Sequence, residues 1–281
     1  MKQKMVVLCR ERIQNFARHV CSIIDEMLIT HGIKETSSAF LGVDAKPHTR
    51  DFSDHDYPEE GIVAEQVDAL VDVCYYIMNL FTKKKNNPYE LPGPNALICD
   101  EWYKMVYEFT SGTDSFHKNG YMSISDVEFI AKMVLSEVWE LCDTVTGTME
   151  ETREMMEKAA LDAKSDLRVE YLNTLRDAST SDASLTDVAY SDPQRVTDHT
   201  IMSLCSIVTA CIQIAQTVML VDIDGVFRVV HGANMNKRDP VTLLFTKRAD
   251  GKVVKPPGWE PPNIEAEIKR QLDLKTLSFR T

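Results

Sequence analysis

The sequence predicts an all-α protein, built as a helical bundle, and three observations lead to that prediction. Apolar residues recur at spacings of three and four along most of the 281 residues, which is the pattern of amphipathic helices. Strict alternation of apolar and polar residues, the mark of a half-buried strand, is scarce. Segments rich in Pro, Gly, Asn and Asp interrupt the helical pattern and supply the connections that a bundle needs.

The periodic segments, taken in order, predict the individual helices. They cover residues 5–31, 60–84, 96–111, 124–146 continuing through 149–177, 194–222 and 224–236. Three loops follow the first three helices, with the sequences GVDAKPHTRDFSDHDYPEE, KKKNNPYELPGPN and TSGTDSFHKNG. The Ser-, Thr- and Asp-rich stretch 177–194 predicts a mobile insert. A tail marked by Pro and Gly follows residue 237 and closes with a short helix.

Composition narrows the function classes. A hydrophobic content of 44% can fill a core, and a formal net charge of -12 leaves no broad basic surface for duplex nucleic acid. The seven cysteines include no CxxC pair and mostly lie in apolar runs, which is typical of reduced thiols in a cytoplasmic protein. The apolar run before Arg10 has only four residues, so we expect no secretory signal.

One segment is long enough to cross a membrane. From Ile201 to Val221 the chain carries no charge for 21 residues. The segment contains two Gln, two Thr and two Ser, and it lacks basic flanks and an aromatic belt. A buried central helix therefore explains it better than a membrane span, and we expect no membrane contact.

Carboxylates on the helix expected over 60–84 give the first indication of function. Glu65, Asp68, Asp72 and Asn79 fall within an arc of ~60° of the helix, while the rest of its circumference is almost wholly apolar. An exposed acidic strip on a half-buried helix is the simpler explanation. The alternative is a site, because clustered carboxylates that face an interior need a cation.

The helix expected over 124–146 carries two more acids of this kind. Glu137 and Glu140 lie on the side shared by Phe129, Ile130 and Met133, so we expect both to point toward the interior. Mg²⁺ is the natural partner for such carboxylates, since it prefers hard oxygen ligands and leaves positions for substrate phosphates. Mn²⁺ is a plausible substitute.

These motifs resemble the all-α nucleotide pyrophosphohydrolases, the MazG-like family that includes phosphoribosyl-ATP pyrophosphohydrolase and the dimeric dUTPases. In that family an ExxE on one helix and an ExxD on the next hold Mg²⁺ against a nucleoside triphosphate. Here EVWE corresponds to Glu137 and Glu140, and EQVD corresponds to Glu65 and Asp68, with Asp72 as an additional acid. The tail HGANMNK, followed by RADGKVVKPPGWEPPNIE, looks like that of a subgroup with HxANMxK and RxDGKxxKPPGW.

The order of the two motifs is reversed relative to the family, and an internal duplication explains the reversal. FARHVCSIIDEML (16–28) can be laid on IAKMVLSEVWELC (130–142), and DEWYKMVYEFT (100–110) on DGVFRVVHGAN (224–234). In this alignment the first copy has lost its ExxE, and in the second copy MSLCSIV stands in place of DALVDVC. Each copy keeps the acids that the other lacks.

The duplication predicts the domain organisation. We expect two degenerate MazG-like units, 1–112 and 113–281, the second with a helical and loop insert at 147–195. Both halves would form one compact bundle with a single composite metal site, to which the residues Glu65, Asp68, Asp72, Glu137 and Glu140 contribute.

Basic and polar residues near the C-terminus are the candidates for substrate binding. His231, Asn234 and Lys237 recur every three residues on the last bundle helix, and Arg248, Lys252 and Lys255 follow in the tail. A cluster of this composition could neutralise a triphosphate. The simpler explanation is a solvated helix end whose basic residues are favoured by the helix dipole.

The resemblance implies a reaction. Water would attack a phosphorus of a nucleoside triphosphate and release a monophosphate and pyrophosphate, with Glu137 and Glu140 as the leading candidates for general base. A house-cleaning role in nucleotide metabolism and a homodimer are both compatible with the family. The alternative is a catalytically inactive relative that kept the helical fold as a scaffold or interaction protein.

Overall fold

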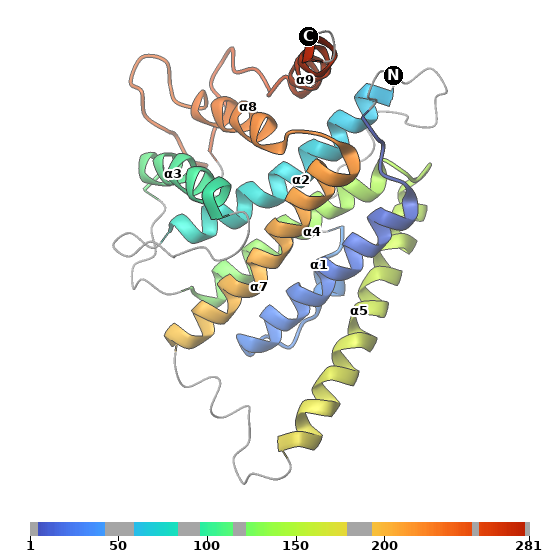
Figure 1. Ribbon diagram of the computed structural model, residues 1–281. Coiled ribbons are helices and arrows are strands. Elements are labelled where there is room, and N and C mark those ends of the chain that lie inside the picture. The colour runs from blue at the N-terminus through green and yellow to red at the C-terminus, as the bar shows by residue number, and fades with distance from the viewer. Residues whose placement is uncertain are drawn as a thin grey trace. The chain divides into compact units, whose positions relative to one another are not determined.

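The computed structural model describes residues 5–42, 59–83, 96–114, 122–178, 193–248 and 253–278 of the chain (Figure 1). The bounds of the helices are Arg10–Thr30 for α1, Glu59–Thr82 for α2, Ala96–Gly112 for α3, Ile124–Asp143 for α4, Met149–Ala178 for α5, Pro193–Gln213 for α7, Ile223–Met235 for α8 and Ile264–Ser278 for α9. Two short turns, η1 over Ser37–Phe40 and the π-helical η2 over Ile214–Met219, complete the elements.

The all-α prediction is confirmed. Within the described ranges β-structure is limited to two isolated bridges, Arg238 with Phe245 and Lys247 with Val253. The helix bounds agree closely with the hydrophobic periodicity, except that α1 begins only at Arg10, after the extended N-cap residue Cys9. The stretch 177–194, predicted to be mobile, lies almost wholly outside the described residues.

The chain packs as two compact units. Unit 1 comprises Met1–Val7, Pro58–Gly120 and Cys211–Thr281, and unit 2 comprises Leu8–Tyr57 and Tyr121–Ala210. Each unit therefore draws on both of the halves, 1–112 and 113–281, that the sequence suggests as repeats. The duplication, and a single bundle formed by both halves, stay predictions.

Unit 2 contains the two helices that were aligned as equivalent first helices of the repeats. α1 packs against α4, and both pack against α5. In the alignment of segments 16–28 and 130–142 a buried position of one corresponds to a buried position of the other almost throughout, for example Phe16 to Ile130 and Val20 to Val134. α5, which falls in the segment 147–195 predicted as an insert, contributes Met155, Met156, Ala159 and Ala163 to the core of this unit.

Unit 1 is organised around α2, which packs against α3, α8 and α9. α3 and α8, the aligned third helices, pack against each other. Their contact is aromatic: Trp102 of α3 stacks on Phe227 of α8 with ring centroids 4.1 Å apart and an interplanar angle of 4°. Both side chains are fully buried. This contact holds α8, which carries the predicted substrate-binding residues His231 and Asn234, against α3.

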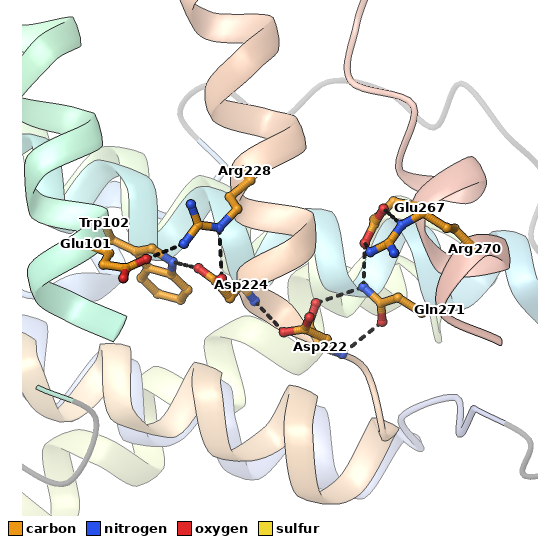
Figure 2. Close-up of polar contacts among 8 residues, drawn as sticks. All are labelled: Glu101, Trp102, Asp222, Asp224, Arg228, Glu267, Arg270 and Gln271. Carbon is orange, nitrogen blue, oxygen red and sulfur yellow. Dashed lines mark hydrogen bonds and ion pairs between the residues drawn. The ribbon is translucent and has the colours of Figure 1, made fainter. Parts of the chain in front are cut away.

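Polar contacts join the start of α8 to α3 and to α9 (Figure 2). The Trp102 indole N–H donates to Asp224 Oδ1 at 2.8 Å, and Arg228 forms ion pairs with Asp224 and Glu101. On the other side, Gln271 of α9 exchanges two hydrogen bonds of 2.9 Å with the backbone of Asp222. The start of α8 is thus bound to α3 and α9 through side chains that are far apart in the sequence.

A glycine permits the approach of α9. A Cβ atom at Gly225 would lie 2.6 Å from Glu267 Oε1 and 3.1 Å from Gln271 Nε2. Glu267 is held in place by Arg270, whose two guanidinium nitrogens donate to its carboxylate at 2.6 Å, and these contacts lower the pKa of Glu267. Only a residue without a side chain fits at this position without displacing that carboxylate.

The apolar segment of α7 and η2 differs from the expected buried helix. One face is buried, with Leu204, Ile207, Val208 and Cys211, whereas Met202, Ser206, Gln213, Gln216 and Thr217 are exposed. The Ser, Gln and Thr side chains that argue against a membrane span occupy much of this exposed face. By length and composition alone, Thr197–Met219 is the one helix in the described ranges that could cross a membrane.

The cysteines are free thiols, as predicted from their spacing. Five of them, Cys21, Cys74, Cys99, Cys142 and Cys211, are buried. Burial raises the pKa of Cys21 to about 12 and that of Cys99 to about 11. These thiols are therefore protonated at neutral pH and behave as small apolar core residues.

Candidate functional site

The acidic stripe of α2 forms as the sequence predicts. Glu65, Asp68, Asp72 and Asn79 are half-buried, and most of the other positions between Gly61 and Thr82 are buried. The stripe follows from the helical repeat, since the steps of three, four and seven residues return to nearly the same side of a helix. α2 therefore presents a narrow line of carboxylates from an otherwise apolar surface.

The next turn of α2 connects this stripe to α8. The Tyr75 hydroxyl lies 3.2 Å from His231 Nδ1 and also hydrogen-bonds the side chain of Asn234. Burial raises the pKa of Tyr75, and burial lowers the pKa of His231. At neutral pH we therefore expect a neutral phenol beside a neutral imidazole, held together by a hydrogen bond.

Lys237 lies just past the end of α8 and is half-buried. Its ammonium donates to Asn234 Oδ1 at 2.5 Å. Burial lowers the pKa of Lys237, the charge of Lys255 lowers it further, and the carboxylate of Asp72 raises it. Of the stripe residues, Asp72 is therefore the one whose charge acts on Lys237.

The PPGW segment of the tail brings Lys255 to the same place. The backbone N–H of Trp259 donates to the Pro256 carbonyl at 3.0 Å, which closes a four-residue turn. Pro257 and Gly258, with φ of +81° at the glycine, occupy the central positions that a type II turn prefers for Pro and Gly. The Trp259 indole N–H then donates to the Ala233 carbonyl at 2.7 Å and fastens the turn to α8.

Alanine at position 258 is expected to weaken this turn. A Cβ at Gly258 would meet nothing within 4 Å, so the cost comes from the left-handed backbone alone and amounts to ~1–2 kcal/mol. Gly232 is a matched control, because a Cβ there also meets nothing and the residue lies inside α8 with no positive φ. Gly232→Ala should stabilise by ~0.5–1 kcal/mol. Urea unfolding of both variants measures the difference, and a Gly258→Ala variant as stable as Gly232→Ala would contradict it.

The ExxE residues lie on α4 in unit 2. Glu137 is buried, as predicted, but Glu140 is exposed, and the expectation that both face the interior is wrong for Glu140. The reason is geometric: Glu140 lies within ~20° of Phe129 around the helix and ~60° from Glu137. Phe129 is itself 40% exposed, so the edge of the buried face passes between the two glutamates.

The remaining predicted residues of the tail lie at the edge of the described region. Arg248 is exposed, and Lys252 falls outside the described residues. Of the six predicted substrate-binding residues, four therefore gather around one position in unit 1: His231, Asn234, Lys237 and Lys255.

The carboxylates of α2 fit Mg²⁺ in chemistry and spacing. Glu65 and Asp68 are three residues apart, and Asp68 and Asp72 four, so each pair lies on adjacent turns of one face. Mg²⁺ usually takes one or two carboxylates and completes its coordination with water and phosphates. No group of three or more His, Cys, Asp and Glu side chains suited to a metal occurs among the described residues. A metal bound by these carboxylates would complete its coordination with water and with ligand oxygens.

The sequence did not predict two features of the site. Tyr75 hydrogen-bonds His231, and the Trp259 ring contacts the ammonium groups of Lys237 and Lys255. The Pro-Pro-Gly turn was a usable signal for Trp259, because it predicts that residues 255 and 259 lie close together. The partner of Tyr75 lies 156 positions away in the sequence and left no local signal.

Comparison of the chain with protein-family models, with curated proteins and with solved structures finds no match. The resemblance to nucleotide pyrophosphohydrolases therefore rests on the motifs of the sequence alone, and membership of that family stays a prediction.

Proposed function

We propose that the protein is a Mg²⁺-dependent nucleotide pyrophosphohydrolase that cleaves a nucleoside or deoxynucleoside triphosphate to the monophosphate and pyrophosphate. The observation that carries the proposal is that unit 1 holds both a half-buried carboxylate stripe on α2 and a pair of lysines over the Trp259 ring, and that Tyr75 of α2 contacts His231 of α8, the helix that precedes Lys237. A metal-bound triphosphate requires carboxylates that hold the metal and, next to them, ammonium groups that bind the phosphates.

Each group has a role in this proposal. The residues Glu65, Asp68 and Asp72, with Glu137 and Glu140 of α4, would hold the metal. Bound Mg²⁺ would offset charge that develops on the phosphates. Lys237 and Lys255 would bind the phosphates that leave, and the neutral pair of Tyr75 and His231 would orient Asn234 beside them. Glu137 or Glu140 would take the proton of the attacking water.

A second candidate is an inactive helical scaffold with the same fold. Two observations favour it: Glu140 is exposed, and no three metal-binding side chains gather in the described part of the chain. A scaffold would retain the aromatic and polar contacts of unit 1 but would have no use for half-buried carboxylates on α2.

A hydrolysis assay distinguishes the two candidates. The full chain is incubated with Mg²⁺, and in parallel with Mn²⁺, and with a panel of canonical and modified nucleoside triphosphates. We expect equal amounts of monophosphate and pyrophosphate. Release of orthophosphate would show cleavage at another bond of the triphosphate, and absence of turnover on every nucleotide with both metals would favour the scaffold.

A further inference from the structure

We propose that Lys237, Lys255 and Trp259 form a binding site for a chain of condensed phosphates, and that Trp259 is a positioning residue for the two ammonium groups instead of a surface on which a base stacks. This inference rests on the proposed function, which it deepens: the ligand would be recognised here by its polyphosphate, and the nucleobase would make no contact at this site.

The geometry centres on one indole ring. Lys255 Nζ lies 4.1 Å from the centroid of the Trp259 ring, and Lys237 Nζ lies 5.5 Å from it. Both distances are within the range at which an ammonium group is attracted to an aromatic face. One ring therefore binds two cations that come from different segments, one after the end of α8 and one from the tail.

The two ammonium groups form a cationic arrangement that suits an extended anion. Two like charges that share one ring repel each other, and the charge of Lys255 accordingly lowers the pKa of the half-buried Lys237. The Asn234 side chain accepts a hydrogen bond from Lys237, and Asp72 provides one carboxylate in the vicinity. An extended anion with several charged oxygens would neutralise both ammonium groups at once, which a single carboxylate ligand would not.

The position of Trp259 argues against stacking on a base. Its indole N–H is engaged with the Ala233 carbonyl at 2.7 Å, and the side chain is half-buried. One edge of the ring is fastened to α8 and both lysines lie over the ring, so a base that stacked on the face they use would displace a cation contact. Its aromatic character is used to hold charge.

The local sequence explains how the site is built. The turn from Pro256 to Trp259 reverses the chain, so that Lys255 at its start and the ring at its end meet. Lys237 reaches the same ring because Asn234, one turn earlier on α8, accepts its hydrogen bond. Each component is held by a separate contact, so the two ammonium groups are organised before a ligand arrives.

Binding of inorganic tripolyphosphate tests the inference without requiring catalysis. Titration calorimetry on the full chain, without divalent metal, should show binding at one site. Lys237→Met and Lys255→Met should each weaken it about tenfold, because a charge-assisted hydrogen bond is lost. The matched control is Lys247→Met, since Lys247 is an exposed basic residue of the same segment and should leave the affinity within about twofold.

Two substitutions of Trp259 separate its roles. Trp259→Phe keeps an aromatic face but loses the N–H bond to the Ala233 carbonyl, so it should lose less affinity for tripolyphosphate than Trp259→Leu, which should lose about tenfold. Equal loss in both variants would overturn the role of the ring. If Trp259→Leu is unstable on heating, a competition experiment takes its place. Tripolyphosphate should displace adenosine triphosphate and uridine triphosphate equally well from the native chain. The inference would be overturned if the relative affinity for the two nucleotides changed strongly in Trp259→Phe.

The outcome is distinguishable from that of the hydrolysis assay. Tripolyphosphate binding that depends on Lys237 and Lys255, without any turnover of nucleotides, would retain this site and remove the proposed function. Hydrolysis of triphosphates by a chain that fails to bind tripolyphosphate would do the reverse.

Discussion

Replacement of Asp68 by Ala is expected to reduce triphosphate hydrolysis by about a thousandfold. Asp68 is the central residue of the α2 stripe, three residues after Glu65 and four before Asp72, so it belongs to both adjacent carboxylate pairs. Loss of a metal ligand removes stabilisation of the developing phosphate charge worth several kcal/mol, and each ~1.4 kcal/mol corresponds to a factor of ten in rate.

Glu60→Ala is the control for this substitution. Glu60 is an acid at the start of the same helix, but it is exposed and lies outside the stripe. It should leave the rate within about twofold. A second control is Glu26→Ala on α1, which aligns with Glu140 but pairs with His199 at 2.8 Å in unit 2. Neither substitution removes a proposed ligand.

Thermal stability provides a readout that does not depend on turnover. If Asp68 binds Mg²⁺, addition of the metal together with a non-hydrolysable nucleotide should raise the melting temperature of the native chain by mass action. Asp68→Ala should lose most of this increase, and Glu60→Ala should keep it. An unchanged metal effect in Asp68→Ala would remove the acidic stripe from the site, whatever the rates show.

Hydrophobic periodicity was sufficient to predict most of the fold. It placed the helices of the bundle and predicted the half-buried line from Glu65 to Asn79, because both depend only on the repeat of a single helix. It could not locate the edge of a buried face to better than about one residue. Glu137 and Glu140 therefore received the same prediction, although one is buried and the other exposed.

Features that depend on pairing between segments were beyond the sequence. The alignment of 16–28 with 130–142 agrees with the burial of α1 and α4, yet it did not indicate that equivalent helices share a compact unit. The hydrogen bond between Tyr75 and His231 and the contact of Lys237 with the Trp259 ring join residues that are far apart in the sequence, and no local pattern predicts either pair. The uncharged polar residues of α7 argue against a membrane span, but the sequence alone does not predict that they form an exposed face of the helix.

Replacement of Trp102 by Ala is expected to have the largest effect on stability, a loss of ~3–5 kcal/mol in the free energy of unfolding. Trp102 is fully buried, and its ring stacks on Phe227. Its N–H also donates to the carboxylate of Asp224, which accepts a second hydrogen bond from Arg228 of α8. The substitution therefore removes apolar contacts, leaves a cavity between α3 and α8, and takes one partner from a carboxylate.

Two further substitutions resolve these contributions. Leu97→Ala, on the same helix, truncates a side chain that is 84% exposed and should change the free energy of unfolding by less than ~0.5 kcal/mol. Trp102→Phe keeps a ring against Phe227 but lacks the N–H, and should cost ~1–3 kcal/mol because Asp224 loses a donor. Urea unfolding monitored by circular dichroism measures all three. If this contact holds α8, the loss of stability should decrease in the order Trp102→Ala, Trp102→Phe, Leu97→Ala. A Trp102→Ala variant as stable as Leu97→Ala would mean that α3 does not support α8.

Trp102→Ala should also weaken tripolyphosphate binding at Lys237, because His231 and Asn234 belong to α8.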